Sequence, residues 1–233
     1  MLWYKGWLET RARLWIALGY MGFLLLSVSF RAAAPGAVGP KPIAGLALMM
    51  GSFVTVMCAV FAGAGIVSQG AFQFLKGLHG STQVTLSLPF SRLHLLAVRA
   101  ALGWVEMAAV LATFCGGVWL VARFITGGAT ALHMLEYAAT LIVCTSALYF
   151  LSVLLATFLD DQGRSWATMA ACVGIWGLPH VAHVPVFTDI FGAMGEASPL
   201  VTHGMPWSAM AFSVSLAALL FVAALRIVRT REY

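Results

Sequence analysis

Residues 137–159 read YAATLIVCTSALYFLSVLLATFL, a run of 23 residues without a charged side chain. An α-helix needs about 20 apolar residues to cross the hydrocarbon core of a bilayer, so this run predicts a membrane-spanning helix. The whole chain has the same character, because 61% of its 233 residues are hydrophobic, 9% are charged and its mean hydropathy is +0.94. These values exclude a soluble domain and predict an all-α integral membrane protein.

Five further uncharged runs predict spans on either side of this one. They cover residues 14–30, 43–67, 107–122, 165–187 and 205–225. The run at 107–122 is short, but it extends backward through LHLLAVRAALGWVEM if Arg99 lies near the interface and Glu106 is accepted inside the membrane. We therefore expect one transmembrane domain of six helices over residues 1–233, with no second globular domain.

The basic residues predict the orientation of the chain. If both termini are cytoplasmic, only Arg31, Lys41 and Arg123 of the 13 Lys and Arg residues fall outside, and cytoplasmic loops are the ones enriched in these residues. Arg164 is counted inside, in LDDQGRS (159–165), which is expected to be a polar connector. The dispersed net charge of +5 indicates topology and gives no nucleic-acid footprint. A multi-pass protein of the cell inner (cytoplasmic) membrane is expected.

The first 13 residues, MLWYKGWLETRAR, have the pattern of a helix lying on the membrane surface. Trp3 and Trp7 fall on one helical face, while Lys5, Glu9 and Arg13 fall on the opposite face. Tryptophan is favoured at headgroup depth and cations face lipid phosphate, so an interfacial helix is expected. The alternative is an irregular cytoplasmic tail.

The longest predicted inner loop covers residues 68–94 and contains STQVTLSLPFSRLHLL (81–96). Pro89 fixes its own φ and biases Leu88 away from helix. Ser91 follows the break and can cap the helix that carries Arg92 into the third span. Movement of this surface element would then be transmitted to the third span.

Three motifs together resemble a known family. LSLPFSRLHLLAVRAALGWVE (86–106) resembles the signature that follows the second span of ABC-2 type transporter permeases, in which leucine, proline, a small or apolar residue, serine and arginine come in order. WYKGWLETRARL before the first span resembles the elbow helix of these permeases, and the tail RTREY resembles their basic-aromatic end. The order of elements along the whole chain is similar to theirs.

The resemblance implies a permease subunit of an ATP-driven exporter working by alternating access. Two six-helix subunits would pair, either as two copies or with a sister permease, and each would dock an ABC ATPase subunit. The implied ATPase-contact residues are Ser81, Thr82, Leu88, Pro89, Phe90, Ser91 and Arg92. The implied elbow residues are Trp3, Trp7, Arg11 and Arg13. Many relatives carry an acidic residue before the signature, whereas FLKGLHGSTQ (74–83) has none.

No phosphate loop of the form GxxxxGK[ST] is present in the sequence. The chain is therefore not expected to be an enzyme, and ATP and Mg²⁺ are expected on the partner subunit, with no cofactor in this chain. Lipids, hydrophobic peptides and drugs are all compatible with its apolar spans as substrates. A membrane scaffold that lacks transport activity shares the same sequence features.

Two carboxylates are candidates for polar or translocation roles inside the membrane. Glu106 lies about 12 residues into the third span, or roughly 18 Å, which is near the midplane. An ionised carboxylate facing lipid there costs a few kcal/mol, so Glu106 is expected to face the bundle or to be protonated. It is either a substrate-path residue or a structural carboxyl. Glu136 lies beside His133 and Tyr137 near the outer end of the fourth span, where water or headgroups would solvate it.

His133, His180, His183 and His203 all map toward the outer side. They provide an alternative reading, in which the protein binds haem or metal or is an intramembrane enzyme. Neither HExxH nor GxSxG is present, and interfacial histidines are the default interpretation. The four cysteines, Cys58, Cys115, Cys144 and Cys172, fall in four different spans without a CxxC pair and are expected to be buried thiols.

The segment at 184–206 is expected to be an outer loop that can hold broken, re-entrant half-helices. Pro179 and Pro185 interrupt the helical pattern, and freed backbone groups must then be satisfied by neighbours or water. The family resemblance implies that this region roofs a translocation path.

Overall fold

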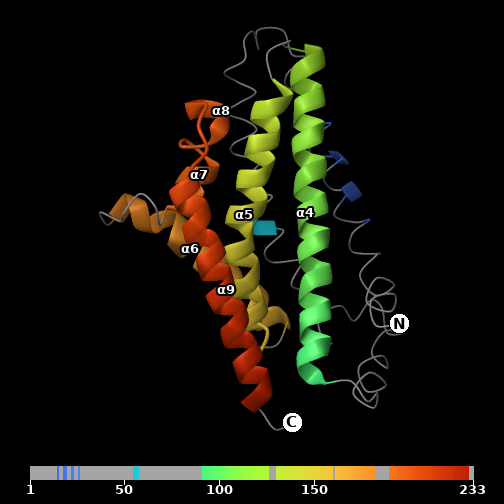
Figure 1. Ribbon diagram of the computed structural model, residues 1–233, viewed down its shortest axis with the longest axis vertical. Coiled ribbons are helices and arrows are strands. Elements are labelled where there is room, and N and C mark those ends of the chain that lie inside the picture. The colour runs from blue at the N-terminus through green and yellow to red at the C-terminus, as the bar shows by residue number, and fades with distance from the viewer. Residues whose placement is uncertain are drawn as a thin grey trace.

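The computed structural model describes residues 91–125, 130–159, 161–181 and 189–230, with isolated positions at 15, 18–19, 22–23, 26 and 55–57. Within these ranges, the side chains at positions 92, 95, 124–125, 161–162 and 178–181 are not described. The elements of this part are helices: α4 (Arg92–Ile125), α5 (Ala131–Leu155), α6 (Asp161–Val181), α7 (Ile190–Met194), α8 (Pro199–Thr202) and α9 (Trp207–Thr230) (Figure 1). The isolated positions are helical and fall within the first two predicted spans.

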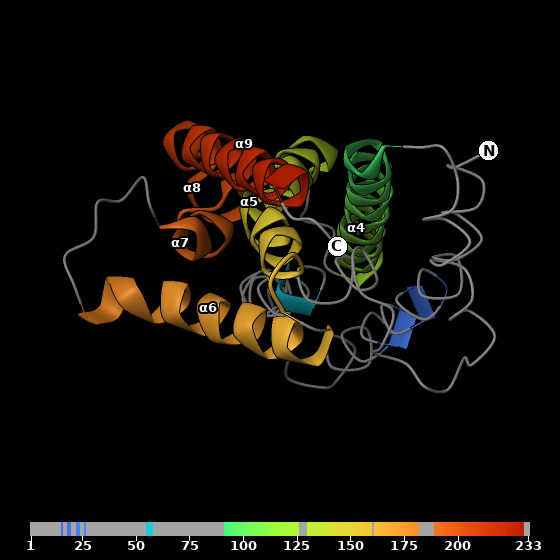
Figure 2. The ribbon, with the colours of Figure 1, turned by 90° about the horizontal axis from the view of Figure 1, so that it is seen from below.

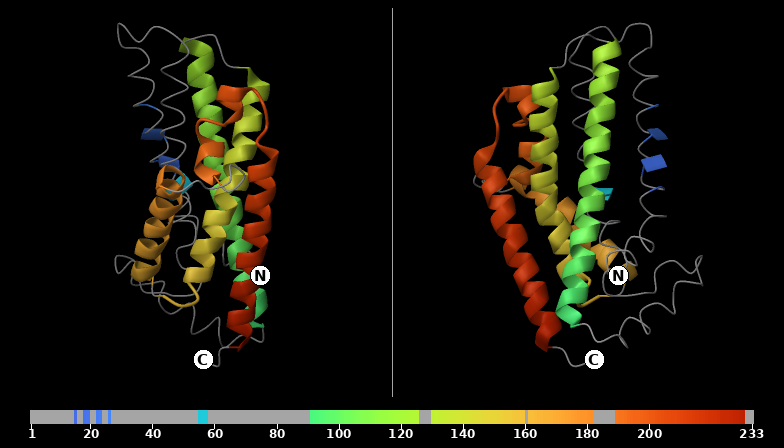
Figure 3. Two further views of the ribbon diagram at one scale, coloured as in Figure 1. Left: turned by 90° about the vertical axis from the view of Figure 1, so that its left-hand side faces the viewer. Right: turned by 45° about the vertical axis from the view of Figure 1, so that its right-hand side comes forward.

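Helix α5 is the centre of the described fold. It contacts α4, α6, α7, α8 and α9. Helices α4 and α9 flank it along the long axis, whereas α6 is inclined to them (Figures 1 and 2). The short helix α8 packs near the end at which α5 begins, and α7 packs further along α5, with Met194 beside Thr145 (Figure 3). We call the end at which α5 begins the α5-start end of the bundle, and the opposite end, where α4 begins and α9 ends, the Ser91 end.

Among the residues that the structure describes, three helices are long and apolar enough to cross a membrane: residues Leu96–Arg123 of α4, α5, and α9. A helix satisfies its backbone hydrogen bonds within itself, which is the condition for crossing hydrocarbon. The all-helical class is thus confirmed for the described residues, and these helices indicate a membrane-embedded protein. Six spans and cytoplasmic termini stay predictions.

Helix α4 begins earlier and ends later than the uncharged run at 107–122. Helix α4 extends backward to Arg92, through Arg99 and Glu106, as the sequence predicts if both residues are accommodated. Its 34 residues correspond to about 51 Å at 1.5 Å per residue, against roughly 30 Å for the hydrocarbon core. Helix α4 is therefore longer than a membrane crossing requires.

The prediction that LDDQGRS (159–165) is a polar connector is wrong for residues 161–165, which are helical. Helix α6 begins at Asp161, and the turn that follows α5 covers residues 156–159. Arg164, expected in a solvated loop, is 1% exposed within the first turn of α6. An arginine is almost never fully buried unless it is paired, and the composition of the connector does not show that Arg164 has an interaction partner in the fold.

Helix α6 has two opposite faces. Trp166, Met169, Val173 and Trp176 are exposed, at spacings of three, four and three residues. Arg164, Thr168 and Cys172 repeat every four residues and are buried. Large apolar side chains on the outer face are typical of a surface that contacts lipid or another apolar partner.

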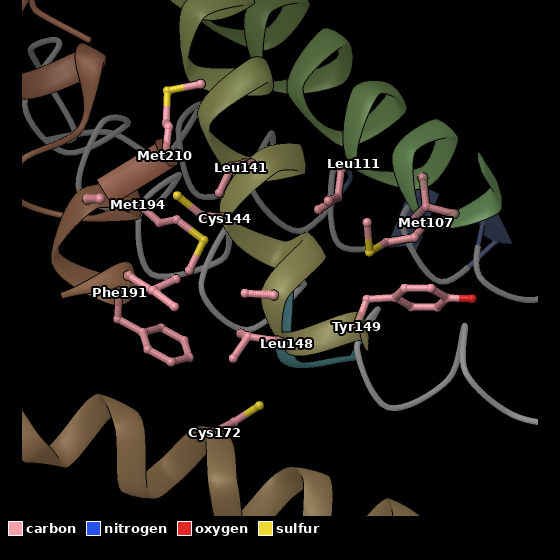
Figure 4. Packing of buried hydrophobic residues seen from close by; sticks show 14 of the residues in the cluster. Met107, Leu111, Leu141, Cys144, Leu148, Tyr149, Cys172, Phe191, Met194 and Met210 are labelled. Atoms are coloured by element: carbon pink, nitrogen blue, oxygen red, sulfur yellow. The ribbon is translucent and has the colours of Figure 1, made fainter. Parts of the chain in front are cut away.

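The buried core lies around α5. Three helices supply side chains that belong to one cluster, and those from α4 and α5 are no more than 1% exposed. They are Leu111 and Phe114 from α4, Leu141 and Leu148 from α5, and Phe191 and Met194 from α7 (Figure 4). Helices α7 and α8 lie in the 184–206 segment that the sequence predicts as broken half-helices. Their entry into a membrane stays a prediction.

Helix α7 depends on a cap from Asp189. The Asp189 carboxylate accepts a hydrogen bond of 2.7 Å from the Gly192 backbone N–H. A Cβ built on Gly192 would overlap this carboxylate. Glycine at 192 therefore permits the close approach of the cap.

We predict that Gly192→Ala displaces the Asp189 carboxylate and lowers the melting temperature of the detergent-purified protein. Loss of an N-terminal cap costs about 1 kcal/mol. Gly174→Ala in α6 is the matched control, because its Cβ would meet nothing within 4 Å. Equal melting temperatures for the two variants would contradict the role of the cap.

Candidate functional site

The start of α4 has the cap that the sequence predicts. The Ser91 hydroxyl oxygen accepts a hydrogen bond of 3.2 Å from the backbone N–H of His94, and α4 begins at Arg92. A serine side chain that satisfies the N–H three residues later is the usual way to begin a helix. The predicted role of Ser91 as a helix cap is confirmed.

Most of the predicted contact residues lie outside the described part of the chain. These are Ser81, Thr82, Leu88, Pro89 and Phe90 in the loop, and Trp3, Trp7, Arg11 and Arg13 in the elbow. Arg92 is described only as the first residue of α4. The interpretation of the inner loop therefore stays a prediction.

Two hydrogen bonds join α4 to α5 on the Ser91 side of the bundle. The Tyr149 hydroxyl donates to the carbonyl oxygen of Ala100 at 2.8 Å. One turn further along α4, Trp104 Nε1 donates to Ser146 Oγ at 2.8 Å, and Ser146 in turn donates to the carbonyl of Ile142 at 2.7 Å. Pairing of Ala100 with Tyr149 and of Trp104 with Ser146 fixes the register of two antiparallel helices.

Charged side chains surround this junction inside the bundle. Glu106 is 8% exposed, as expected for a carboxyl that faces the interior. Glu106 and Arg164 both lie within electrostatic range of the Tyr149 phenol, and both have interaction partners in the fold. Helices α4, α5 and α6 thus each bring a polar group to one buried region, which we call the Tyr149 junction: Glu106, Tyr149 and Arg164.

Arg164 is the member of the Tyr149 junction that sequence reasoning missed. A signal was present, because Arg164, Thr168 and Cys172 share one face of α6, opposite the exposed Trp166 and Val173. If residues 161–181 are taken as one helix, this pattern places Arg164 on the buried face. The burial of Glu106 agrees with both predicted roles, a structural carboxyl and a substrate-path residue.

At the α5-start end, the structure brings together two of the four outer histidines. The imidazole rings of His133 and His203 lie with their centroids 4.9 Å apart. The side chain of Glu136 is half-buried, and its backbone carbonyl accepts a hydrogen bond from Thr140. The His180 side chain and the whole of His183 lie outside the described residues.

A conventional metal cluster is not found in the part of the chain that the structure describes, where no three His, Cys, Asp or Glu residues converge. Cys115, Cys144 and Cys172 are buried free thiols, and Cys58 lies outside the described residues. Two imidazoles in contact are fewer than the three or four ligands of a protein zinc site.

We predict that Tyr149→Phe weakens the α4–α5 register by removing the hydroxyl that bonds the Ala100 carbonyl. A buried neutral hydrogen bond contributes about 1 kcal/mol, so the melting temperature should fall without loss of membrane insertion. Ser215→Ala is the control, because its exposed hydroxyl bonds only the carbonyl of its own helix, at Ala211. A Tyr149→Phe protein as stable as the Ser215→Ala protein would show that the hydrogen bond is dispensable.

Comparisons with protein-family models, with curated proteins and with solved structures find no match for this chain. A conclusion on function therefore has to come from the residues of the chain and their contacts, because a fold alone does not specify an activity.

Proposed function

We propose that this chain is the membrane-spanning permease subunit of an ATP-driven ABC transporter that works as an exporter. ATP hydrolysis takes place on a separate ABC ATPase subunit, which also holds Mg²⁺, and alternating access of the spans moves the substrate. A second permease copy or a sister permease completes the pair. The chain lies in the cell inner membrane with both termini in the cytoplasm.

One observation carries the proposal. In the predicted SLPFSR corner (87–92), Ser91 caps α4, which begins at Arg92 and continues without interruption for 34 residues. A continuous helix transmits displacement along its length because each residue is hydrogen-bonded to the next turn. A push on the corner therefore moves the buried part of α4 directly.

The contacts of α4 determine which other helices are displaced with it. Hydrogen bonds at Tyr149 and Ser146 pass it to α5, which contacts all the other described helices. Glu106 travels with α4 and changes its position relative to Arg164 on α6. This supports a function in which a contact at residues 81–92 changes the packing of the whole bundle.

The first experiment is purification in mild detergent from the native membrane, with identification of soluble partners that are stoichiometric with this chain. We expect an ATP-hydrolysing subunit. A chain that purifies without ATPase activity would contradict the transporter function and favour the scaffold.

We predict that Pro89→Ala and Arg92→Ala uncouple ATP hydrolysis from export while membrane insertion stays intact. Proline sets the corner geometry, and arginine at 92 supplies the charged group of the contact. ATPase activity and export are measured on the reconstituted complex. Normal export by both variants would remove the coupling role from this corner.

The Ser91 cap gives a sharper test of the same mechanism. Ser91→Ala removes the acceptor for the His94 N–H, which costs about 1 kcal/mol at the start of α4, whereas Ser91→Asp keeps an acceptor. We predict reduced export per ATP hydrolysed for Ser91→Ala and recovery for Ser91→Asp. Equal loss in both variants would mean that the serine acts by another route than capping.

The contact between His133 and His203 favours metal binding as a second candidate function. It is independent of the Ser91 corner, because the two features lie at opposite ends of the bundle (Figure 1).

A further inference from the structure

Imidazole and sulfur side chains follow one face of α5 from the α5-start end into the core. On α5, His133 is followed by Thr140 and Cys144, and positions seven and eleven residues apart fall on the same face of a helix. Elements α7 to α9 supply the side chains opposite. We call the whole set the soft-ligand stripe: His133, Cys144, Met194, His203, Met205 and Met210.

The stripe begins at the histidine pair. His203 ends α8 with φ at 55°, in the left-handed region that few residues other than glycine adopt. In this conformation its ring lies 4.9 Å from that of His133, measured between centroids. Two imidazoles from different elements thus meet at the end of the bundle.

Two thioethers come next. The Thr140 hydroxyl oxygen lies 3.9 Å from Met205 Sδ and 4.0 Å from Met210 Sδ. Both sulfur atoms are therefore gathered around one hydroxyl group, two turns of α5 below His133. Met205 is also only two residues from His203, so the thioethers continue directly from the imidazole pair.

The stripe ends in the core with a thiol and a third thioether. Cys144 and Met194 are both 0% exposed, and the Cys144 thiol is directed from α5 toward the Met194 side chain (Figure 4). Met194 Sδ lies 4.0 Å from Thr145 Oγ1, which fixes it against α5. From His133 to Cys144 the stripe runs for about 16 Å along α5.

Exposure falls steadily along this path. His203 is exposed, His133 and Met205 are half-buried, and Met210 is 8% exposed. Solvent-accessible ligands at one end and buried ligands at the other provide a route from the surface into the bundle. A set of methionines that served packing alone would not need imidazoles at its entrance.

The chemical types of these side chains favour one class of metal ion. Thioether, thiol and imidazole groups favour soft ions such as Cu(I), whereas carboxylates and water favour hard ions. The thioether and imidazole ligands are neutral and suit a monovalent ion better than a divalent one, because less charge must be compensated inside the bundle. Cys144 would bind as the thiolate and release its proton to water. The sulfur atoms of Met205 and Met210, both near Thr140, are the thioether groups that follow the imidazoles along α5.

We propose that the soft-ligand stripe binds Cu(I), which enters between His133 and His203 and is held by Met205 and Met210. Cys144 and Met194 provide the next ligands inward. Binding goes beyond the transporter function and does not rest on it, because the stripe is complete within this chain and needs no ATPase partner.

The test uses the full-length chain in detergent, without its partners, under anaerobic conditions with ascorbate. Cu(I) is offered as its coloured bicinchoninate complex, and transfer to the protein is followed by loss of colour. We expect one or more Cu(I) per chain, with sulfur ligands visible by X-ray absorption at the copper edge. Met210→Leu and His203→Asn should each lower the affinity at least tenfold.

Both substitutions are chosen to leave the fold intact. Leucine conserves the apolar volume of methionine, and asparagine tolerates a left-handed backbone. Met107→Leu is the matched control, because Met107 is 1% exposed in α4 and is not a member of the stripe.

Three results would overturn the proposal. These are failure of the wild-type chain to take Cu(I) from bicinchoninate, equal affinities for the Met210→Leu and Met107→Leu proteins, and copper bound with nitrogen ligands only. Each can be obtained whether or not an ATPase subunit is found, so failure of copper binding and failure of the transporter function are distinguishable.

Discussion

The hydrogen bond from the Tyr149 hydroxyl to the Ala100 carbonyl, with the Trp104–Ser146 bond one turn away, fixes α4 against α5. Between helices in lipid the hydrophobic effect offers little driving force, since lipid tails are as apolar as the side chains. Packing and polar bonds between helices then set the register. Because α5 contacts every other described helix, its register with α4 positions the rest of the bundle.

The same region contains two ionisable side chains in the interior of the bundle. Glu106 and Arg164 reach the surroundings of Tyr149 from α4 and α6. A buried charge is tolerated only when other groups compensate it, so these helices cannot separate or rotate freely. Any movement of α4 has to rearrange this polar region, which makes it the natural place for a conformational change to be felt.

The two ends of the bundle have different chemistry. At the Ser91 end, Ser91 caps the start of α4, and Arg226 and Arg229 lie near the end of α9. At the α5-start end, imidazoles and thioethers gather around the start of α5 and the short helices α7 and α8. The proposed coupling at one end and the proposed Cu(I) binding at the other are compatible, because α5 runs between the two ends.

Sequence alone determined the membrane class, the all-helical architecture, the start of α4 and its serine cap, because apolar run length and capping chemistry are local properties. It also placed Glu106 in the interior, since an ionised carboxylate facing lipid is costly. Only the tertiary structure decided that Ala100 pairs with Tyr149 and that His133 meets His203. It also decided that the sulfur atoms of Met205 and Met210 lie near Thr140. These contacts join residues 49 or more positions apart, and the register that brings them together depends on how whole helices pack, which no local pattern encodes.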